Sequence, residues 1–163
     1  MSLYLLDSNI FIEAKNRYYG MDFCPAFWDF LDDQINKTNI VSIAYVYTEL
    51  TKGNDGLSQW IKNRKDSGFF LSNEDEETQR ELSEIVQYVS NNYSQEEANR
   101  FLNVADPWLI AKAKVLEATL ITQEVLAPSN TKKVKIPNIC QKFGVNFSTP
   151  FEMLRSLDAK FVL

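Results

Sequence analysis

Short runs of apolar residues alternate along the chain with longer stretches in which apolar residues recur at helical spacing. The short runs indicate buried strands, because strands of a parallel sheet that is covered on both faces are apolar throughout. They occur at residues 3–6, 40–41, 68–72, 118–122 and 145–147. Strands alternating with helices predict an α/β protein with three layers, in which helices cover both faces of a central parallel sheet.

Local signals for helix starts and ends place helices between these strands. Pro25 suits the first turn of a helix over residues 23–31, and Ser42 is expected to cap a helix that ends near Gly53. Ser94 and Glu97 have the spacing of a capping box. Further helices are expected over residues 57–65, from Asn73 to about Tyr88, from Asp106 with Pro107 in the first turn, from Pro137, and after a Thr149 cap.

The chain has 163 residues, of which 45% are hydrophobic, enough for one well-formed core. We therefore expect a single domain over residues 1–163. The sequence contains no apolar run long enough to span a membrane, and its start lacks a basic region before an apolar stretch. These features predict a soluble, cytoplasmic protein without membrane contact.

Histidine is absent, which excludes histidine-based triads, histidine zinc ligands and a histidine general base. Cys24 and Cys140 are far apart and form no CxxC pattern, so they are interpreted as two ordinary buried thiols. The net charge of −5 argues mildly against nucleic-acid binding, although it says little about a single cleft. Any chemistry must depend on carboxylates, lysines, hydroxyls or a bound ion.

Carboxylates border the edge of the predicted sheet where parallel strands end, which is where ligands bind in such proteins. Asp7 directly follows the first apolar strand, Glu124 follows the strand at 118–122, and Asp106 begins a helix that is apolar on nearly all sides. Glu49 lies on the flank of the helix after Ser42. Clustered carboxylates repel one another unless a cation neutralises them, and such oxygen ligands suit Mg²⁺ or Mn²⁺.

Each of these residues also has an ordinary structural interpretation. Asp106 is a natural helix cap, Glu49 has Lys52 nearby as an ion-pair partner, and Glu124 is a loop residue. Asp7 is the hardest to explain in this way, because Ser8 or Asn9 serves equally well as a cap.

Four segments together resemble the ordered signature of the PIN-domain family: "LLDSNIFIEA", "VSIAYVYTEL", "ADPWLIAKA" and "TLITQE". They occur in the order and with the separations expected for that family, over nearly the whole chain. The stretch "EAKNRYYGMDFCPAFWDFL" is similar to one uncharacterised branch of PIN proteins found near prokaryotic antitoxin-like genes. The resemblance implies a compact α/β nuclease fold with an acidic, Mg²⁺- or Mn²⁺-dependent centre.

Carried over residue by residue, the resemblance implies that Asp7, Glu49 and Asp106 bind the metal and act in catalysis. Asn9 then orients Asp7 or a bound water, and Thr122 supplies a hydroxyl that closes the site. Glu124 stands where many relatives have Asp, so its longer side chain reaches the ion through water or contributes only charge.

The substrate is expected to contact basic and aromatic residues beside the acidic segments, since aromatic rings stack on unpaired bases and cations track phosphates. The candidates are Lys15, Arg17 and Tyr18, with a second basic run at 132–135; a solvated surface is the alternative for both. Tyr18, Tyr19, Phe27 and Trp28 could support docking of a protein partner or a homodimer, or simply pack in the core.

The leading hypothesis is a metal-dependent endoribonuclease of the VapC-like toxin kind, with RNA as substrate and an antitoxin protein as partner. The alternative is a catalytically inert PIN-like module that binds RNA or a protein. A phosphate-transfer domain of receiver or haloacid-dehalogenase type is disfavoured, because Ser8 and Asn9 stand where such a domain needs a second carboxylate.

Overall fold

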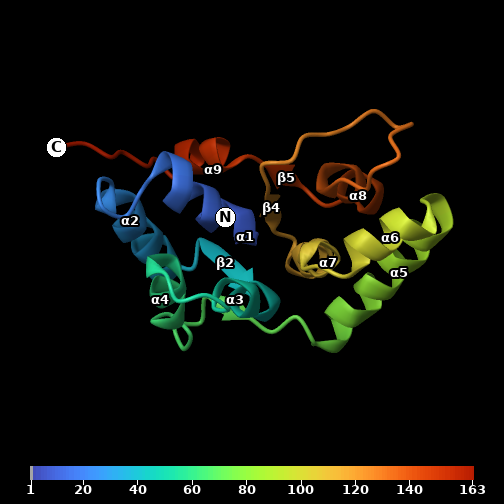
Figure 1. Ribbon diagram of the computed structural model, residues 1–163, viewed down its shortest axis with the longest axis horizontal. Coiled ribbons are helices and arrows are strands. Elements are labelled where there is room, and N and C mark those ends of the chain that lie inside the picture. Colours follow the sequence, from blue (N-terminus) through green and yellow to red (C-terminus); the bar gives the residue numbers. More distant parts are fainter. Residues whose placement is uncertain (1) are drawn as a thin grey trace.

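The computed structural model describes residues 2–163, and its centre is a parallel sheet (Figure 1). Within the described residues the sheet has five strands in the order β3-β2-β1-β4-β5. Every neighbouring pair is parallel. The strands are β1 (Tyr4–Leu6), β2 (Ile40–Ile43), β3 (Phe70–Leu71), β4 (Thr119–Ile121) and β5 (Phe147–Ser148). The prediction of an α/β fold with a central parallel sheet is confirmed, and all five carboxyl ends share one edge.

Helices cover both sides of this sheet, giving three layers (Figure 1). In the view of Figure 1, α2 and α4 lie to one side of the strands, whereas α5, α6 and α7 lie to the other. The helices are α1 (Ser8–Glu13), a π-helix η1 (Ala14–Tyr18), α2 (Pro25–Asn36), α3 (Ala44–Leu50), α4 (Gly56–Lys62), α5 (Glu76–Asn92), α6 (Gln95–Leu102), α7 (Asp106–Leu116), α8 (Ile136–Phe143) and α9 (Pro150–Ser156).

The core follows the apolar pattern of the sequence. Leu5, Leu6 and Leu120 on the central strands are fully buried, and Phe11 packs edge-on against Phe69. Helix α7 is buried on most of its surface because it packs against β4, α5, α6 and α8 at once. This explains why its sequence is apolar nearly all round and lacks the polar stripe of a surface helix.

The predicted caps at Ser94 and Thr149 are confirmed, since each hydroxyl accepts a hydrogen bond from the backbone three residues on. The prediction that Ser42 caps a helix is wrong. Ser42 lies within β2, and its hydroxyl donates to the carbonyl of Leu6 on β1 at 2.7 Å. A buried hydroxyl in a sheet needs such a partner, so Ser42 joins two strands and α3 begins two residues later.

The predicted starts of two other helices also differ from the structure. Asp75, not Asn73, caps α5 by accepting from the backbone N–H of Thr78. Asp106 is the first residue of α7, and Ala105 occupies the cap position. The π-helix η1 was not predicted; single π turns of this kind are frequent near functional sites.

The two cysteines are free thiols, Cys24 half-buried and Cys140 buried, so only Cys140 meets the prediction in full. No helix in residues 2–163 is long and apolar enough to cross a membrane. The predicted domain, residues 1–163, includes Met1, which lies outside the described residues, and its extent stays a prediction.

Candidate functional site

Asp7 stands at the tip of the central strand β1 and caps helix α1. Its Oδ1 accepts hydrogen bonds from the backbone N–H groups of Asn9 at 2.8 Å and Ile10 at 3.3 Å. No described residue donates to Oδ2. Since no buried side-chain oxygen in the described part of the chain is left unpaired, Oδ2 must keep some access to solvent. One oxygen is therefore held by the start of the helix, and the other accepts no hydrogen bond from a described residue.

Among the described residues, no cation is close enough to Asp7 to lower its pKa. The side chain is 4% exposed. Burial, followed by the Asp106 carboxylate and more weakly that of Glu124, raises the pKa of Asp7 to about 7, although the two amide hydrogen bonds act in the opposite direction. A carboxyl group with this pKa is half protonated near neutral pH unless a cation arrives.

Asp106, the first residue of α7, is close enough to other acidic residues for their charges to act on it. Burial raises its pKa to about 6, with further contributions from the carboxylates of Glu124 and Glu49. Asp106 thus feels Glu124 and Glu49, while Asp7 feels Asp106 and Glu124. The structure therefore brings all four predicted carboxylates to the same edge of the sheet.

Glu49 reaches this edge from helix α3, where a serine holds it. The Ser8 hydroxyl donates to its Oε2 at 2.7 Å and so links the start of α1 to α3. Among the described residues, the ion pair with Lys52 that the sequence suggested does not form. Sequence reasoning considered Ser8 only as a helix cap and missed this contact, because its partner lies 41 residues away.

Glu124 is held by hydrogen bonds on both sides of the turn that follows β4. Its Oε2 accepts from the backbone N–H of Ile136 at 2.8 Å, at the start of α8. Its own backbone N–H donates to the hydroxyl of the buried Thr122 at 3.1 Å. Thr122 therefore shapes the turn, and Glu124 uses one carboxylate oxygen at a helix N-terminus, a favourable place for negative charge.

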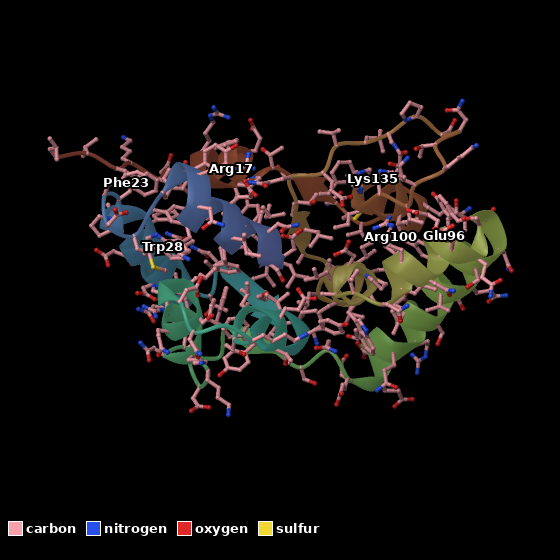
Figure 2. The ribbon with its side chains drawn as sticks, in the orientation of Figure 1. Arg17, Phe23, Trp28, Glu96, Arg100 and Lys135 are labelled. Carbon is pink, nitrogen blue, oxygen red and sulfur yellow. The ribbon has the colours of Figure 1, made fainter. Side chains whose placement is uncertain are left out.

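Arg100 on α6 is a cation whose charge acts on the acidic edge, at Asp106. It lowers the pKa of Asp106, and the charges of Glu124 and Asp106 help to raise its own. Its guanidinium binds Glu97 and donates to the carbonyl of Val134 at 3.1 Å, on the α6 and α8 side of the molecule (Figure 2). Glu97 also accepts from the N–H of Val134 at 2.8 Å. The i,i+3 spacing of Glu97 and Arg100 signals their pairing, but nothing in the sequence signals their proximity to Asp106.

The predicted supporting residue Asn9 acts through its backbone. Its N–H holds Asp7, whereas its side chain is exposed. Lys15, predicted to contact substrate, donates to Asp55 at 2.6 Å, at the start of α4.

Arg17 and Tyr18 line a hollow of about 440 Å³ together with Gln123, Thr149 and Phe151. Gln123 lies between Thr122 and Glu124, so this hollow borders the acidic edge on its β4 and β5 side. Arg17 pairs with Glu13 at 2.9 Å, and Tyr18 meets Phe151 edge-on at 5.5 Å. Arg17 belongs to η1, and Figure 2 shows it well apart from Arg100.

Four carboxylates at one edge of the sheet imply a divalent cation as ligand. Their arrangement decides whether such an ion fits. In residues 2–163 no three Asp, Glu, His or Cys side chains gather closely enough to enclose a metal ion. Mg²⁺, however, keeps several waters and needs only one or two carboxylates beside its substrate phosphate. Asp7, whose pKa is raised by burial and by Asp106, and Asp106, whose pKa is raised by burial, Glu124 and Glu49, fit such a partly hydrated ion.

The five-stranded parallel sheet of residues 2–163, with β1 at its centre and helices on both faces, is a PIN-like fold, similar to that of a chain in a solved VapBC2 structure. Residues 4–161 match the family described as a domain of unknown function, DUF4411, and the chain belongs to this family.

Among solved structures, that of VapBC2 from Rickettsia felis bound to a DNA fragment from their promoter contains a similar chain. The two superimpose with a TM-score of 0.52 at 14% sequence identity, over 90% of this chain and 98% of that chain. At this identity the likeness shows the fold alone. Among curated proteins, none matches the sequence.

Proposed function

We propose that the protein is a metal-dependent endoribonuclease that hydrolyses phosphodiester bonds of single-stranded or structured RNA. One observation carries the proposal: the buried Asp7 and the half-buried Asp106 both have raised pKa values at the carboxyl edge of a parallel sheet, and the charge of Asp106 acts on Asp7. A protein gains nothing in stability from such an arrangement, because uncompensated buried charge is costly. A divalent cation removes that cost.

In this proposal Asp7 and Asp106 hold Mg²⁺ or Mn²⁺ directly. Glu49 and Glu124 already accept hydrogen bonds from Ser8 and Ile136, so they would contribute negative charge beside the ion. The bound ion would lower the pKa of a water molecule and offset the charge that builds on the leaving oxygen. The chain supplies rigidity: two backbone amides fix one oxygen of Asp7, and Thr122 fixes the turn that carries Glu124.

The test is cleavage of an end-labelled single-stranded RNA with Mn²⁺ present, comparing wild type with Asp7→Asn. Asparagine keeps the helix cap and removes the charge. Asp75→Asn is the matched control, because Asp75 also caps a helix but pairs with Lys112 at 2.8 Å. Loss of cleavage by about a hundredfold in Asp7→Asn alone supports the proposal, whereas equal cleavage by wild type and Asp7→Asn points to a contaminating nuclease and refutes it.

The fold likeness to VapBC2 supports a further part of the proposal, that the protein is the toxin of a toxin–antitoxin pair. The expected partner is a small antitoxin that places a basic side chain on the acidic edge. Expression of the wild type should then arrest bacterial growth, and co-expression of the neighbouring gene should restore it. Arrest that persists with Asp7→Asn would separate toxicity from the acidic site.

One observation favours the second candidate, an inert PIN-like module that binds RNA or protein. The described residues contain no group of three potential metal ligands. One carboxylate oxygen of Glu124 already accepts a hydrogen bond from the N–H of Ile136 at the start of α8. Calorimetric titration with Mn²⁺ separates the two candidates. Heat of binding that disappears in Asp7→Asn favours the nuclease, and the absence of binding at millimolar Mn²⁺ favours the inert module.

A further inference from the structure

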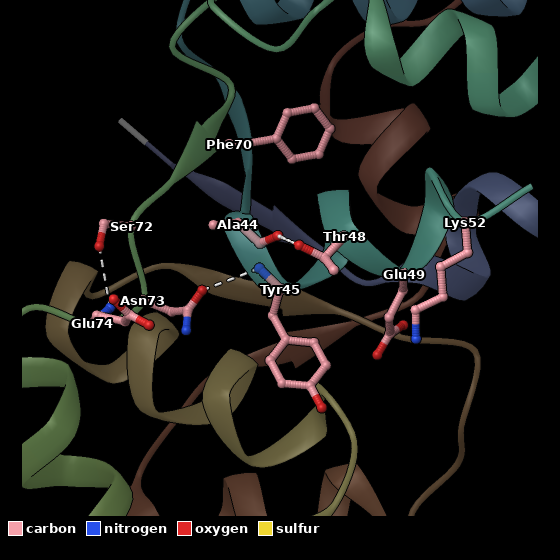
Figure 3. Close-up of a pocket in the computed structure, with 9 residues that line it drawn as sticks. All are labelled: Ala44, Tyr45, Thr48, Glu49, Lys52, Phe70, Ser72, Asn73 and Glu74. Atoms are coloured by element: carbon pink, nitrogen blue, oxygen red, sulfur yellow. Dashed lines mark hydrogen bonds between the residues drawn. The ribbon is translucent and has the colours of Figure 1, made fainter.

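A second hollow opens on the other side of the acidic edge, between α3 and the segment that follows β3 (Figure 3). It has a volume of about 550 Å³, within the usual range for small-molecule sites. Glu49 belongs to its wall, so a ligand in this pocket lies next to the acidic residues. Its lining residues are Ala44, Tyr45, Thr48, Glu49, Lys52, Phe70, Ser72, Asn73 and Glu74.

Asn73 gives this pocket a fixed and available hydrogen-bond donor. The residue is 6% exposed, and its Oδ1 accepts from the backbone N–H of Tyr45 at 3.1 Å (Figure 3). Its Nδ2 donates to no described residue, and yet no buried side-chain nitrogen there is unpaired. Nδ2 therefore remains accessible at the pocket wall, with its orientation set by the bond to Tyr45.

Flat aromatic surfaces form other parts of the wall. The Tyr45 hydroxyl donates to the carbonyl of Asn103 at 3.2 Å, which holds the ring in place, and Phe70 is held edge-on by Tyr47 at 5.2 Å. Figure 3 shows the Lys52 amine and the Glu49 carboxylate on the same side of the pocket. The pocket thus combines ring faces, one fixed amide donor and a cation beside the acidic edge.

We infer that this pocket binds the nucleobase of the RNA nucleotide adjacent to the scissile phosphate, an inference that rests on the proposed ribonuclease function. Aromatic rings stack on unpaired bases, and an asparagine amide reads the polar edge of a base. Lys52 is then placed for the phosphate that follows. A free anion suits the pocket poorly because Glu49 and Glu74 line it, and a purely apolar ligand would leave Asn73 without an acceptor.

The experiment fills the pocket and measures RNA binding without hydrolysis. Fluorescent single-stranded hexamers of each base are titrated in EDTA with wild type and with Thr48→Trp, whose indole would occupy the pocket. Ser83→Trp is the matched control, because both hydroxyls are exposed, lie within helices and donate to the carbonyl four residues earlier. Thermal unfolding verifies that each variant is folded.

A loss of affinity of about tenfold or more in Thr48→Trp, with Ser83→Trp unchanged, supports the subsite, since stacking of one base commonly contributes that much. Equal affinity of the two tryptophan variants overturns it and leaves the proposed function standing. Failure of the wild type to bind any hexamer at micromolar protein also overturns the subsite, while the Mn²⁺ cleavage assay still decides the function.

A second variant tests recognition rather than space. Asn73→Asp keeps the acceptor for the Tyr45 amide and replaces the donor Nδ2 with an oxygen. We expect the order of affinity among the four hexamers to change, and the mapped cleavage positions to shift with it. A uniform loss for all four hexamers would contradict a base-reading role for Asn73.

Discussion

Asp7 and Asp75 have the same local structure and opposite electrostatics. Each caps a helix by accepting hydrogen bonds from backbone N–H groups in the first turn. At Asp75 a hydrogen bond from Lys112 lowers the pKa of the carboxyl to about 2, whereas burial and the neighbouring carboxylates raise the pKa of Asp7 to about 7. Asp55 caps α4, and a hydrogen bond from Lys15 likewise lowers the pKa of its carboxyl.

The difference teaches that helix capping does not explain Asp7. Asp75 and Asp55, which cap helices, each pair with a lysine, whereas Asp7 has further acids as its charged neighbours; Arg100 acts on Asp106 and is not among the groups that shift the pKa of Asp7. The acidic edge therefore costs stability that the capping sites do not cost. Such a cost is typical of functional sites.

The largest expected effect is on the structural side of this comparison. Asp75→Asn keeps the helix cap but leaves the Lys112 ammonium, whose side chain is 10% exposed, without its partner. Because the Asp75 side chain is 37% exposed, solvent screening reduces the cost of breaking this pair below that of a fully buried one, to about 2–3 kcal/mol of unfolding free energy, or roughly 4–12 °C in Tm. Calorimetric unfolding at pH 7 measures it. An unchanged Tm would mean that Lys112 finds another acceptor.

The same substitution at the edge of the sheet should raise the unfolding free energy, whereas Asp75→Asn lowers it. Asp7→Asn removes a buried charge and should stabilise the protein by about 2 kcal/mol at pH 8, since a carboxyl with a raised pKa favours folding only while protonated. The gain should shrink as the pH falls through 7 and vanish near pH 4, where both wild-type states carry the proton. Tm values of both proteins across pH 4–8 test this. A gain that does not depend on pH would contradict the raised pKa.

A cation should partly reverse this difference between the two sites. At tenfold excess over its Kd, Mn²⁺ should stabilise the wild type by about 1.4 kcal/mol, because only the folded chain gathers the carboxylates. Asp7→Asn should show no such shift, while Asp75→Asn should show it in full. Thermal-shift titrations at pH 8 with Ca²⁺ and Na⁺ controls measure the effect. Equal shifts in all three proteins would place the ion elsewhere.

The smallest effect belongs to the exposed pair at Asp55. Its side chain is 52% exposed, so Asp55→Asn should change the unfolding free energy by no more than about 0.5 kcal/mol, and less in high salt. Denaturant unfolding at two salt concentrations checks this. A larger loss, comparable to that of Asp75→Asn, would show that exposure is not what separates the two lysine-paired caps.

Local pattern was enough to predict much of the fold. The strand before Asp7 and the helices capped by Ser94 and Thr149 depend on neighbours within a few residues, and their sequence signals are correspondingly clear. The predictions that proved wrong concern residues whose hydrogen-bond partners are distant in the sequence. Ser42 bonds to Leu6 across 36 positions and Asn73 to Tyr45 across 28, so neither acts as the local helix cap that its sequence suggests.

The same distinction applies to the candidate site. Asp7, Asp106 and Glu124 could be named because each follows a recognisable strand or begins a recognisable helix. Glu49 lies on the flank of a recognisable helix, and the family resemblance supplied the grouping of all four. Ser8, Arg100 and the pocket around Asn73 could not be named, since their roles arise from contacts between segments that only the folded chain brings together.

The strand order also bears on how such a protein diversifies. The chain builds its sheet outward from β1, so the strand that carries Asp7 lies at the centre and the two-residue strands β3 and β5 lie at the margins. Each flanking hollow takes part of its wall from the segment after a marginal strand: Ser72, Asn73 and Glu74 follow β3, and Thr149, Pro150 and Phe151 follow β5. Mutation can therefore remodel either margin, and with it what the protein selects, while the tightly packed middle stays as it is.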